Sequence, residues 1–190
     1  MSAGNNFSNF LKTVLSCFLF CTVFSCDNYK PEALSTVVKE QEKTITIQPF
    51  DDLQPEKVQY VANEIRKVYP NIKILAPVPI TKEAYYAPRN RYRADTIIRK
   101  LRQKADKNEI IIALTSKDIS TTNAGHPDFG VMGLGFSPGS ACVASNFRVK
   151  NNGQFAKVAI HELGHTQGLP HCPVKTCLMR DAEGKTAQIN

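Results

Sequence analysis

Near the C-terminal end of this 190-residue sequence, the segment HELGHTQGLPH spans residues 161–171 and holds three of the chain's four histidines. His161 and His165 are four residues apart, a spacing that puts both side chains on one face of a helix, one turn apart. Two imidazole nitrogens placed in this way can bind one Zn²⁺ ion at about 2.0–2.1 Å. The fold must therefore support a helix over these residues, beside a metal site.

The residues after this helix predict a third ligand. Gly168 comes three residues after His165, and glycine readily adopts the left-handed conformation that ends a helix. The chain can then turn back through Pro170 and bring His171 to the same ion. Three protein ligands leave one coordination position open, which is typical of a catalytic zinc site. The sequence thus predicts one catalytic Zn²⁺ ion held by His161, His165 and His171.

Glu162 is the acid of this segment. At 3.6 residues per turn it lies about 100° around the helix from His161, so it can reach a water molecule beside the metal without being a ligand. The helix is apolar around most of its circumference between Phe155 and Leu163, which indicates burial. Polar side chains buried there are costly unless they are paired or bind a metal. We therefore predict that Glu162 is the general base of a zinc-dependent hydrolase.

The preceding chain alternates strand and helix patterns. Helical spacing follows Pro55 and stops before Pro70. Glycine-rich and apolar segments joined by a Pro-Gly turn near the zinc motif predict a hairpin. Strands are predicted for five segments: residues 44–48, 72–75, 109–115, 130–136 and 141–149.

These patterns predict an α/β fold of zincin type. We expect a mixed, mostly parallel twisted sheet with an antiparallel edge strand. Two packing helices are expected on one face of the sheet, with the zinc-binding helix below it.

The N-terminal segment resembles a bacterial lipoprotein signal. Residues 13–25 form an uncharged apolar run after Lys12, shorter than the about 20 residues of a membrane span. The run ends in VFSC, whose Cys26 is predicted to carry lipid as the first mature residue. An uncleaved signal anchor is the alternative. Either reading puts the domain outside the cytoplasm, anchored to a membrane of the bacterial cell envelope.

The predicted organisation has three parts: a signal peptide over residues 1–25, a tether over 26–43 and the working domain over 44–190. Within the domain, residues 89–104 carry seven lysines and arginines against one acid. We interpret them as the solvated face of a helix, with attraction to anionic lipid or acidic peptides as the alternative. Nucleic acid is not expected as a partner of an extracytoplasmic lipoprotein.

The stretch HELGHTQGLPHCPVKTCLM resembles the archaemetzincins, a family of zinc metallopeptidases of metzincin type. Their motif continues from the third histidine through two cysteines to a methionine, which here are Cys172, Cys177 and Met179. The resemblance implies a metzincin-like fold and a peptide or protein substrate. It also implies that Met179 is the methionine that lies beneath the zinc, called the Met-turn methionine. A plain core methionine is the alternative.

One departure from the family concerns a second metal. The family has another cysteine pair after the methionine, which binds a structural zinc together with the first pair. This sequence has no cysteine after Cys177, so a four-cysteine site cannot form within it. Cys172 and Cys177 are left with three readings: a disulfide, free thiols or remnants of a lost metal site.

The sequence therefore predicts a zinc-dependent peptidase. A substrate peptide is expected to lie extended beside the glycine-rich edge near residues 130–136. One alternative is a membrane-tethered lipoprotein that binds zinc or peptide without turnover. Another is a zinc amidohydrolase that acts on a non-peptide amide. His126, alone in the segment GHPDFG, is interpreted as a turn residue.

Overall fold

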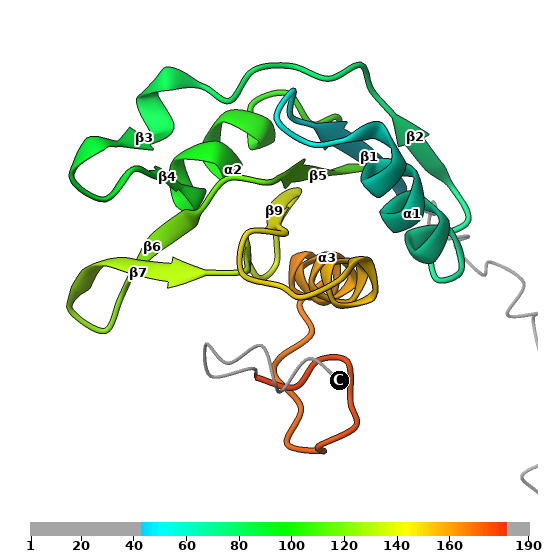
Figure 1. Ribbon diagram of the computed structural model, residues 1–190. Helices are drawn as coiled ribbons and strands as arrows, with labels where there is room; N and C mark the ends of the chain where they lie inside the picture. Colours follow the sequence, from blue (N-terminus) through cyan, green and yellow to red (C-terminus); the bar gives the residue numbers. More distant parts are fainter. Residues whose placement is uncertain (1–42, 182–190) are drawn as a thin grey trace, which may run out of the picture. The chain divides into compact units, whose positions relative to one another are not determined.

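The computed structural model describes residues 43–181 (Figure 1). The predicted signal peptide, the tether up to residue 42 and the predicted lipidation site Cys26 lie outside the described residues, as do residues 182–190. Among the helices described, none combines the length and the apolar character that crossing a bilayer requires.

A five-stranded sheet forms the centre of the described domain, in the order β2-β1-β5-β9-β8. β1 is parallel to β2 and β5, and β5 is parallel to β9, whereas β8 runs antiparallel to β9 at the edge. The predicted mixed sheet with an antiparallel edge strand is confirmed. The bounds of the strands are β1 Thr44–Pro49, β2 Ile72–Ile74, β5 Glu109–Thr115, β8 Gly133–Gly135 and β9 Ala141–Ser145.

Helices cover both faces of this sheet. α1 (Pro55–Arg66) and α3 (Asn152–Thr166) share a hydrophobic cluster with Ile110 and Ile112 of β5. α2 (Ala94–Arg102) packs on the opposite face in a second cluster with other residues of β5. The expectation that α1 and α2 lie together, opposite the zinc-binding helix, is therefore wrong.

The order of the strands explains this layering. The connection from β1 through α1 leads to β2 on one side of β1. The connection from β2 through α2 returns past β1 to β5 on the other side. Because such crossovers are right-handed, two that travel in opposite directions put their helices on opposite faces. α3 then follows β9 and covers the same face as α1.

A second sheet, in the order β3-β4-β6-β7, is not anticipated by the sequence patterns. Part of it comes from the lysine- and arginine-rich residues 89–104, which are helical only from Ala94 onward. Two short 3₁₀ helices, Lys82–Ala84 and Ala87–Arg89, flank β3. The bounds of its strands are β3 Tyr85–Tyr86, β4 Arg91–Arg93, β6 Ile119–Asn123 and β7 His126–Val131.

Ion pairs explain why arginines can occupy this sheet. Arg91 of β4 binds Asp118 at 2.7 Å and Asp128 at 2.9 Å, and its side chain is only 17% exposed. Arg148, in the loop after β9, binds the other oxygen of Asp118 at 2.8 Å. The interpretation of a solvated helix face is therefore wrong for Arg91, although it holds for the exposed cations at the end of α2.

The connection between the two sheets becomes one wall of the site described below. β7 is the edge of the second sheet, and β8, the edge of the first, follows it after Met132. His126 is exposed and begins β7 directly after the turn at Ala124 and Gly125, where φ is 44° and 83°. The turn itself consists of residues 124–125, so the interpretation of His126 as a turn residue is displaced by one position: it is the first residue of the strand.

Candidate metal centre

The local sequence fixes both ends of α3, which carries the zinc motif. At the start, the Asn151 side chain accepts a hydrogen bond of 2.9 Å from the backbone N–H of Gln154. At the end, Gly168 has φ of +87°, which confirms the predicted left-handed residue. The backbone N–H of Leu169 donates to the carbonyl of Gly164, and that of Gly168 donates to the carbonyl of His165. This Schellman-type ending turns the chain back toward the helix.

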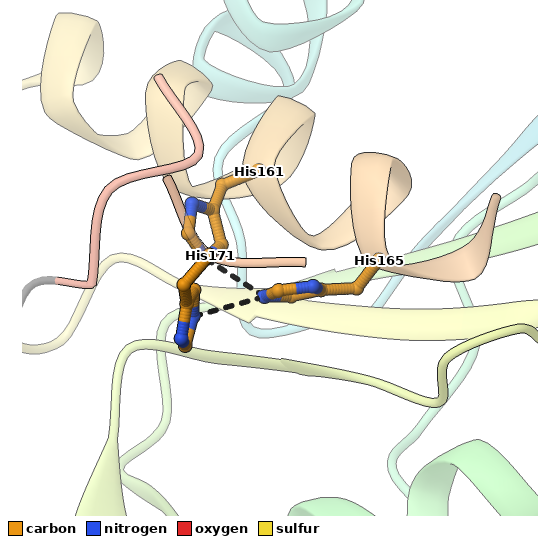
Figure 2. Close-up of side chains that lie close together, drawn as sticks. All are labelled: His161, His165 and His171. Atoms are coloured by element: carbon orange, nitrogen blue, oxygen red, sulfur yellow. Dashed lines mark hydrogen bonds between the residues drawn. The ribbon is translucent and has the colours of Figure 1, made fainter. Parts of the chain in front are cut away.

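The three histidines of the motif converge on one point (Figure 2). His161 and His165 project from α3, and His171 reaches them from the loop that follows. The Nε2 atom of His165 lies 3.0 Å from Nε2 of His161 and 3.2 Å from Nε2 of His171. One ligand atom from each residue lies within 4.8 Å of the other two. The structure thus brings together all three predicted metal ligands.

Hydrogen bonds at the other ring nitrogens define which atoms are free to bind a metal. Nδ1 of His161 lies 2.9 Å from the carbonyl oxygen of Leu178, and Nδ1 of His165 lies 2.9 Å from that of Leu169. A carbonyl oxygen can only accept, so each Nδ1 must carry the proton and donate it. The Nε2 atoms of both rings are then lone-pair donors that point at one another. Such convergence is repulsive unless a cation lies between them.

The spacing and protonation of these rings fit zinc. Two nitrogens bound tetrahedrally to one Zn²⁺ at 2.0–2.1 Å are about 3.3 Å apart, close to both observed separations. Burial lowers the pKa of His161 and of His165 below the ordinary histidine value. The neutral imidazole, which is the form that binds metal, is therefore favoured at neutral pH.

Glu162 lies beside this cluster in a buried position. Its side chain is 7% exposed, and burial raises the pKa of Glu162 to about 8. Its carboxyl group lies against Gly133 of β8, where an added Cβ atom would come within 2.5 Å of Oε1. Within residues 43–181, no side chain or backbone group forms a hydrogen bond or ion pair with this carboxyl group. The carboxyl group is therefore available to a water molecule or a substrate.

The raised pKa of Glu162 has a consequence for the metal-free protein. In the unfolded chain the carboxyl has a pKa near 4.5, so between about pH 4.5 and 8 the folded state binds more protons than the unfolded state. Stability then falls as pH rises through this window, by on the order of 5 kcal/mol in total. Glu162→Gln removes this loss, because a neutral amide does not titrate.

Urea unfolding in the presence of a chelator tests this expectation. The stability of Glu162→Gln relative to the unsubstituted protein should increase steadily from pH 5 to pH 8 and then level off. The lowered pKa values of the histidines make stability rise with pH below about 6.5. Because the histidines titrate in both proteins, this contribution cancels in the difference between the two free energies of unfolding. An equal stability difference at pH 5 and pH 8 would contradict the buried, unpaired state of this carboxyl group.

The glycine-rich strand β8 allows α3 to approach closely. A Cβ atom at Gly135 would lie 2.7 Å from the backbone oxygen of Glu162 and 3.3 Å from Cβ of His165. The sequence pattern indicates an edge strand that another backbone can approach. In the structure, β8 is such an edge, and the backbone of α3 approaches it at this glycine.

The loop after His171 supports the site from the other side of α3. The backbone N–H of Cys172 donates a 2.8 Å hydrogen bond to the carbonyl of Met179, which closes the loop. The Met179 sulfur lies against Gly164, where an added Cβ atom would be 2.5 Å away. Gly164 lies directly before His165 on the helix. Met179 therefore packs against α3 next to His165, and its role as the Met-turn methionine remains a prediction from the family resemblance.

The cysteines of this loop are free thiols in the structure. Cys172 and Cys177 are hydrogen-bonded to each other, and that bond lowers the pKa of Cys172. Cys142 is fully buried in the core of the sheet and belongs to a different part of the domain. The structure therefore has free thiols and no disulfide at this pair, and the reading as a remnant of a lost metal site stays a prediction.

A cavity of about 640 Å³ opens in front of the histidines. Its walls are α3, the β7–β8 segment and the loop after α3, which is described as far as Asp181. Sequence patterns did not identify Lys157 and Arg180, which also line it. Lys157 precedes His161 by four residues on the helix, and this spacing is a signal that could have placed it on the same face.

The mixed sheet with its antiparallel edge strand, together with three convergent histidines at a helix and the loop after it, defines an α/β protein of metzincin type. No family model matches the chain. It is 29% identical to the archaemetzincin of Haloarcula marismortui over 151 residues, covering 71% of this chain and 84% of that one. Against the archaemetzincin of Archaeoglobus fulgidus, it is 29% identical over 143 residues, covering 72% and 83%. The chain is a homologue of the archaemetzincins.

Solved structures agree with this assignment. The crystal structure of the Archaeoglobus fulgidus archaemetzincin in complex with malonate aligns with a TM-score of 0.66 at 25% identity, covering 77% of this chain and 90% of that one. The Methanopyrus kandleri archaemetzincin aligns with a TM-score of 0.67 at 23% identity, covering 80% and 87%. The metzincin-like fold expected from the sequence is confirmed.

Proposed function

We propose that this protein is a zinc metallopeptidase that hydrolyses peptide bonds. The observation that carries the proposal is the convergence of three imidazole Nε2 atoms beside the buried carboxyl group of Glu162, at the floor of a cavity. The homology to archaemetzincins supports the same class of enzyme.

In this proposal His161, His165 and His171 hold one zinc ion. When bound, zinc makes water acidic near neutral pH and polarises the carbonyl of the scissile peptide bond. The carbonyl oxygens of Leu178 and Leu169 fix the ring orientation of the two helical histidines. These hydrogen bonds hold the ligands in position before substrate arrives.

Glu162 moves the proton. Its carboxylate accepts a proton from the attacking water, while the water oxygen forms a bond to the carbonyl carbon. The same proton then passes to the amide nitrogen as the C–N bond breaks, which yields a carboxylic acid and an amine. A carboxyl group can make both transfers, because it accepts the proton as a carboxylate and releases it again as a carboxylic acid.

The strand edges beside the cavity favour a peptide substrate over a small amide. β7 and β8 are both edge strands, and their residues from Phe129 to Gly135 line the cavity. An extended peptide can add its backbone hydrogen bonds to such an edge. Alternate side chains of such a peptide would then project toward α3.

Cleavage of a peptide library, read by mass spectrometry, tests the function. The zinc-loaded protein should cut a mixed library, lose this activity in excess chelator and regain it when zinc is restored. A tethered binding protein without turnover would retain zinc and cut nothing. That result would reject the peptidase.

The N-terminal segment predicts where in the cell the enzyme acts. We propose that lipid on Cys26 tethers the domain to a membrane outside the cytoplasm, as the signal-like run over residues 13–25 predicts. The peptide and protein substrates would then be those of the cell envelope.

A further inference from the structure

Two cationic side chains in the cavity have no part in the proposed chemistry. Lys157 is exposed and lies on α3 one turn before His161. Arg180 is partly exposed and comes directly after Met179 in the supporting loop. Both line the cavity in front of the histidines, where a substrate side chain would enter.

Among the described residues, no acidic group forms an ion pair with either cation. Asp181 also lines the cavity, and its carboxylate lies 3.7 Å from Nδ1 of His171 without an ion pair to Lys157 or Arg180. Glu162 is buried at the cavity floor. Within residues 43–181, neither Lys157 nor Arg180 forms an ion pair or a side-chain hydrogen bond. The cavity therefore offers two cations to a bound ligand.

The direction of the edge strand decides which side of the scissile bond meets Lys157. Gly133 lies against the carboxyl group of Glu162, and Gly135 lies against Cβ of His165. From Gly133 to Gly135, β8 therefore runs in the same direction along α3 as the helix itself. The residues that precede β8 lie nearer the N-terminal part of α3, which carries Lys157. Antiparallel pairing, the slightly more stable arrangement, makes a peptide run from the His165 end toward Lys157.

The distances involved suit the first residues after the cleaved bond. One helical turn puts Lys157 about 6 Å along the helix axis from His161. An extended peptide advances about 3.3 Å per residue, so the first or second residue after the scissile bond comes level with it. An acidic side chain or a terminal carboxylate at this point comes level with Lys157, and Arg180 adds a second positive charge to the lining of the same cavity.

We propose that Lys157, with Arg180, selects peptides that carry a carboxylate one or two residues after the scissile bond. This inference rests on the proposed peptidase function and specifies its substrate class. The group that the cations would recognise is a carboxylate, which an aspartate or glutamate side chain or the C-terminus of a short peptide can supply.

Matched peptides test the proposal. One arm compares Glu with Gln after the scissile bond in C-terminally amidated peptides. The other compares the free acid with the amide at the end of a short peptide. The Glu peptide or the free acid should be cleaved with about five-fold higher kcat/KM than its partner, since an exposed ion pair is worth up to about 1 kcal/mol. Lys157→Met should abolish this preference, and Lys157→Glu should reverse it in favour of a Lys peptide.

Lys150→Met is the matched control, because Lys150 is exposed and lies outside the cavity. This variant should keep the full preference. Whichever arm shows a Lys157-dependent preference identifies the source of the carboxylate. Equal cleavage in both arms, a preference that survives Lys157→Met, or a preference on the N-terminal side of the scissile bond would overturn the proposal.

A binding measurement separates this inference from the peptidase itself. Fluorescence anisotropy of the same labelled peptides on the zinc-loaded Glu162→Gln protein requires no turnover. Tighter binding of the Glu peptide or the free acid, weakened by Lys157→Met and by added salt, supports the selection even if no peptide is cut. Equal affinities for all four peptides would refute it even if cleavage is efficient.

Discussion

Glu162→Gln should retain zinc and lose peptide cleavage. The amide has nearly the same size as the carboxyl group, so the packing against Gly133 and the three histidines should persist. It cannot accept the proton of the attacking water, and loss of a general base lowers kcat by about 10²–10⁴-fold. The measurement is kcat on a peptide found in the library, together with zinc content by atomic emission.

Glu56→Gln supplies the matched control for this substitution. Glu56 is an exposed residue of the first turn of α1, far along the chain from the cavity walls. This variant should keep the kcat and the zinc content of the unsubstituted protein. If Glu162→Gln cleaved peptides at more than half the normal rate, Glu162 would not be the base.

Two substitutions on β8 should separate catalysis from stability. Gly135→Ala puts a Cβ atom 2.7 Å from a backbone oxygen of α3, which cannot move without shifting the helix. Overpacking of this kind typically costs about 1–3 kcal/mol. The helix carries His161 and His165, so zinc affinity should fall along with the free energy of unfolding.

Gly133→Ala differs because its new Cβ atom meets the side chain of Glu162, which can rotate away. Its free energy of unfolding should change little, while kcat falls because the carboxyl group is displaced. Urea unfolding, zinc titration and peptide cleavage of both variants measure these effects. Equal losses of stability in the two variants would show that the close approach of α3 at Gly135 is not the cause.

The chemistry of the site could be predicted from sequence because it is encoded locally. A spacing of four residues on a helix places His161 beside His165, and the left-handed Gly168 turns the chain so that His171 can join them. The carboxyl group of Glu162 follows from the same helical period. These relations hold whatever the rest of the chain does.

Longer-range features could not be predicted in the same way. The second sheet uses strands as short as Tyr85–Tyr86, and Arg91 enters it only because Asp118 and Asp128 come from distant positions to pair with it. The placement of α1 with α3 follows from the order of strands, which no local pattern contains. The role of Gly135 likewise depends on how near α3 comes.

X-ray absorption spectroscopy of the zinc-loaded protein tests the metal centre most directly. The three-histidine site predicts one zinc per chain, with three imidazole nitrogens and one oxygen at about 2.0–2.1 Å, and loss of stoichiometric binding in His165→Ala. Sulfur at about 2.3 Å would instead place the metal on Cys172 and Cys177. That spectrum, or a protein that remains metal-free when zinc is supplied, would contradict the three-histidine site.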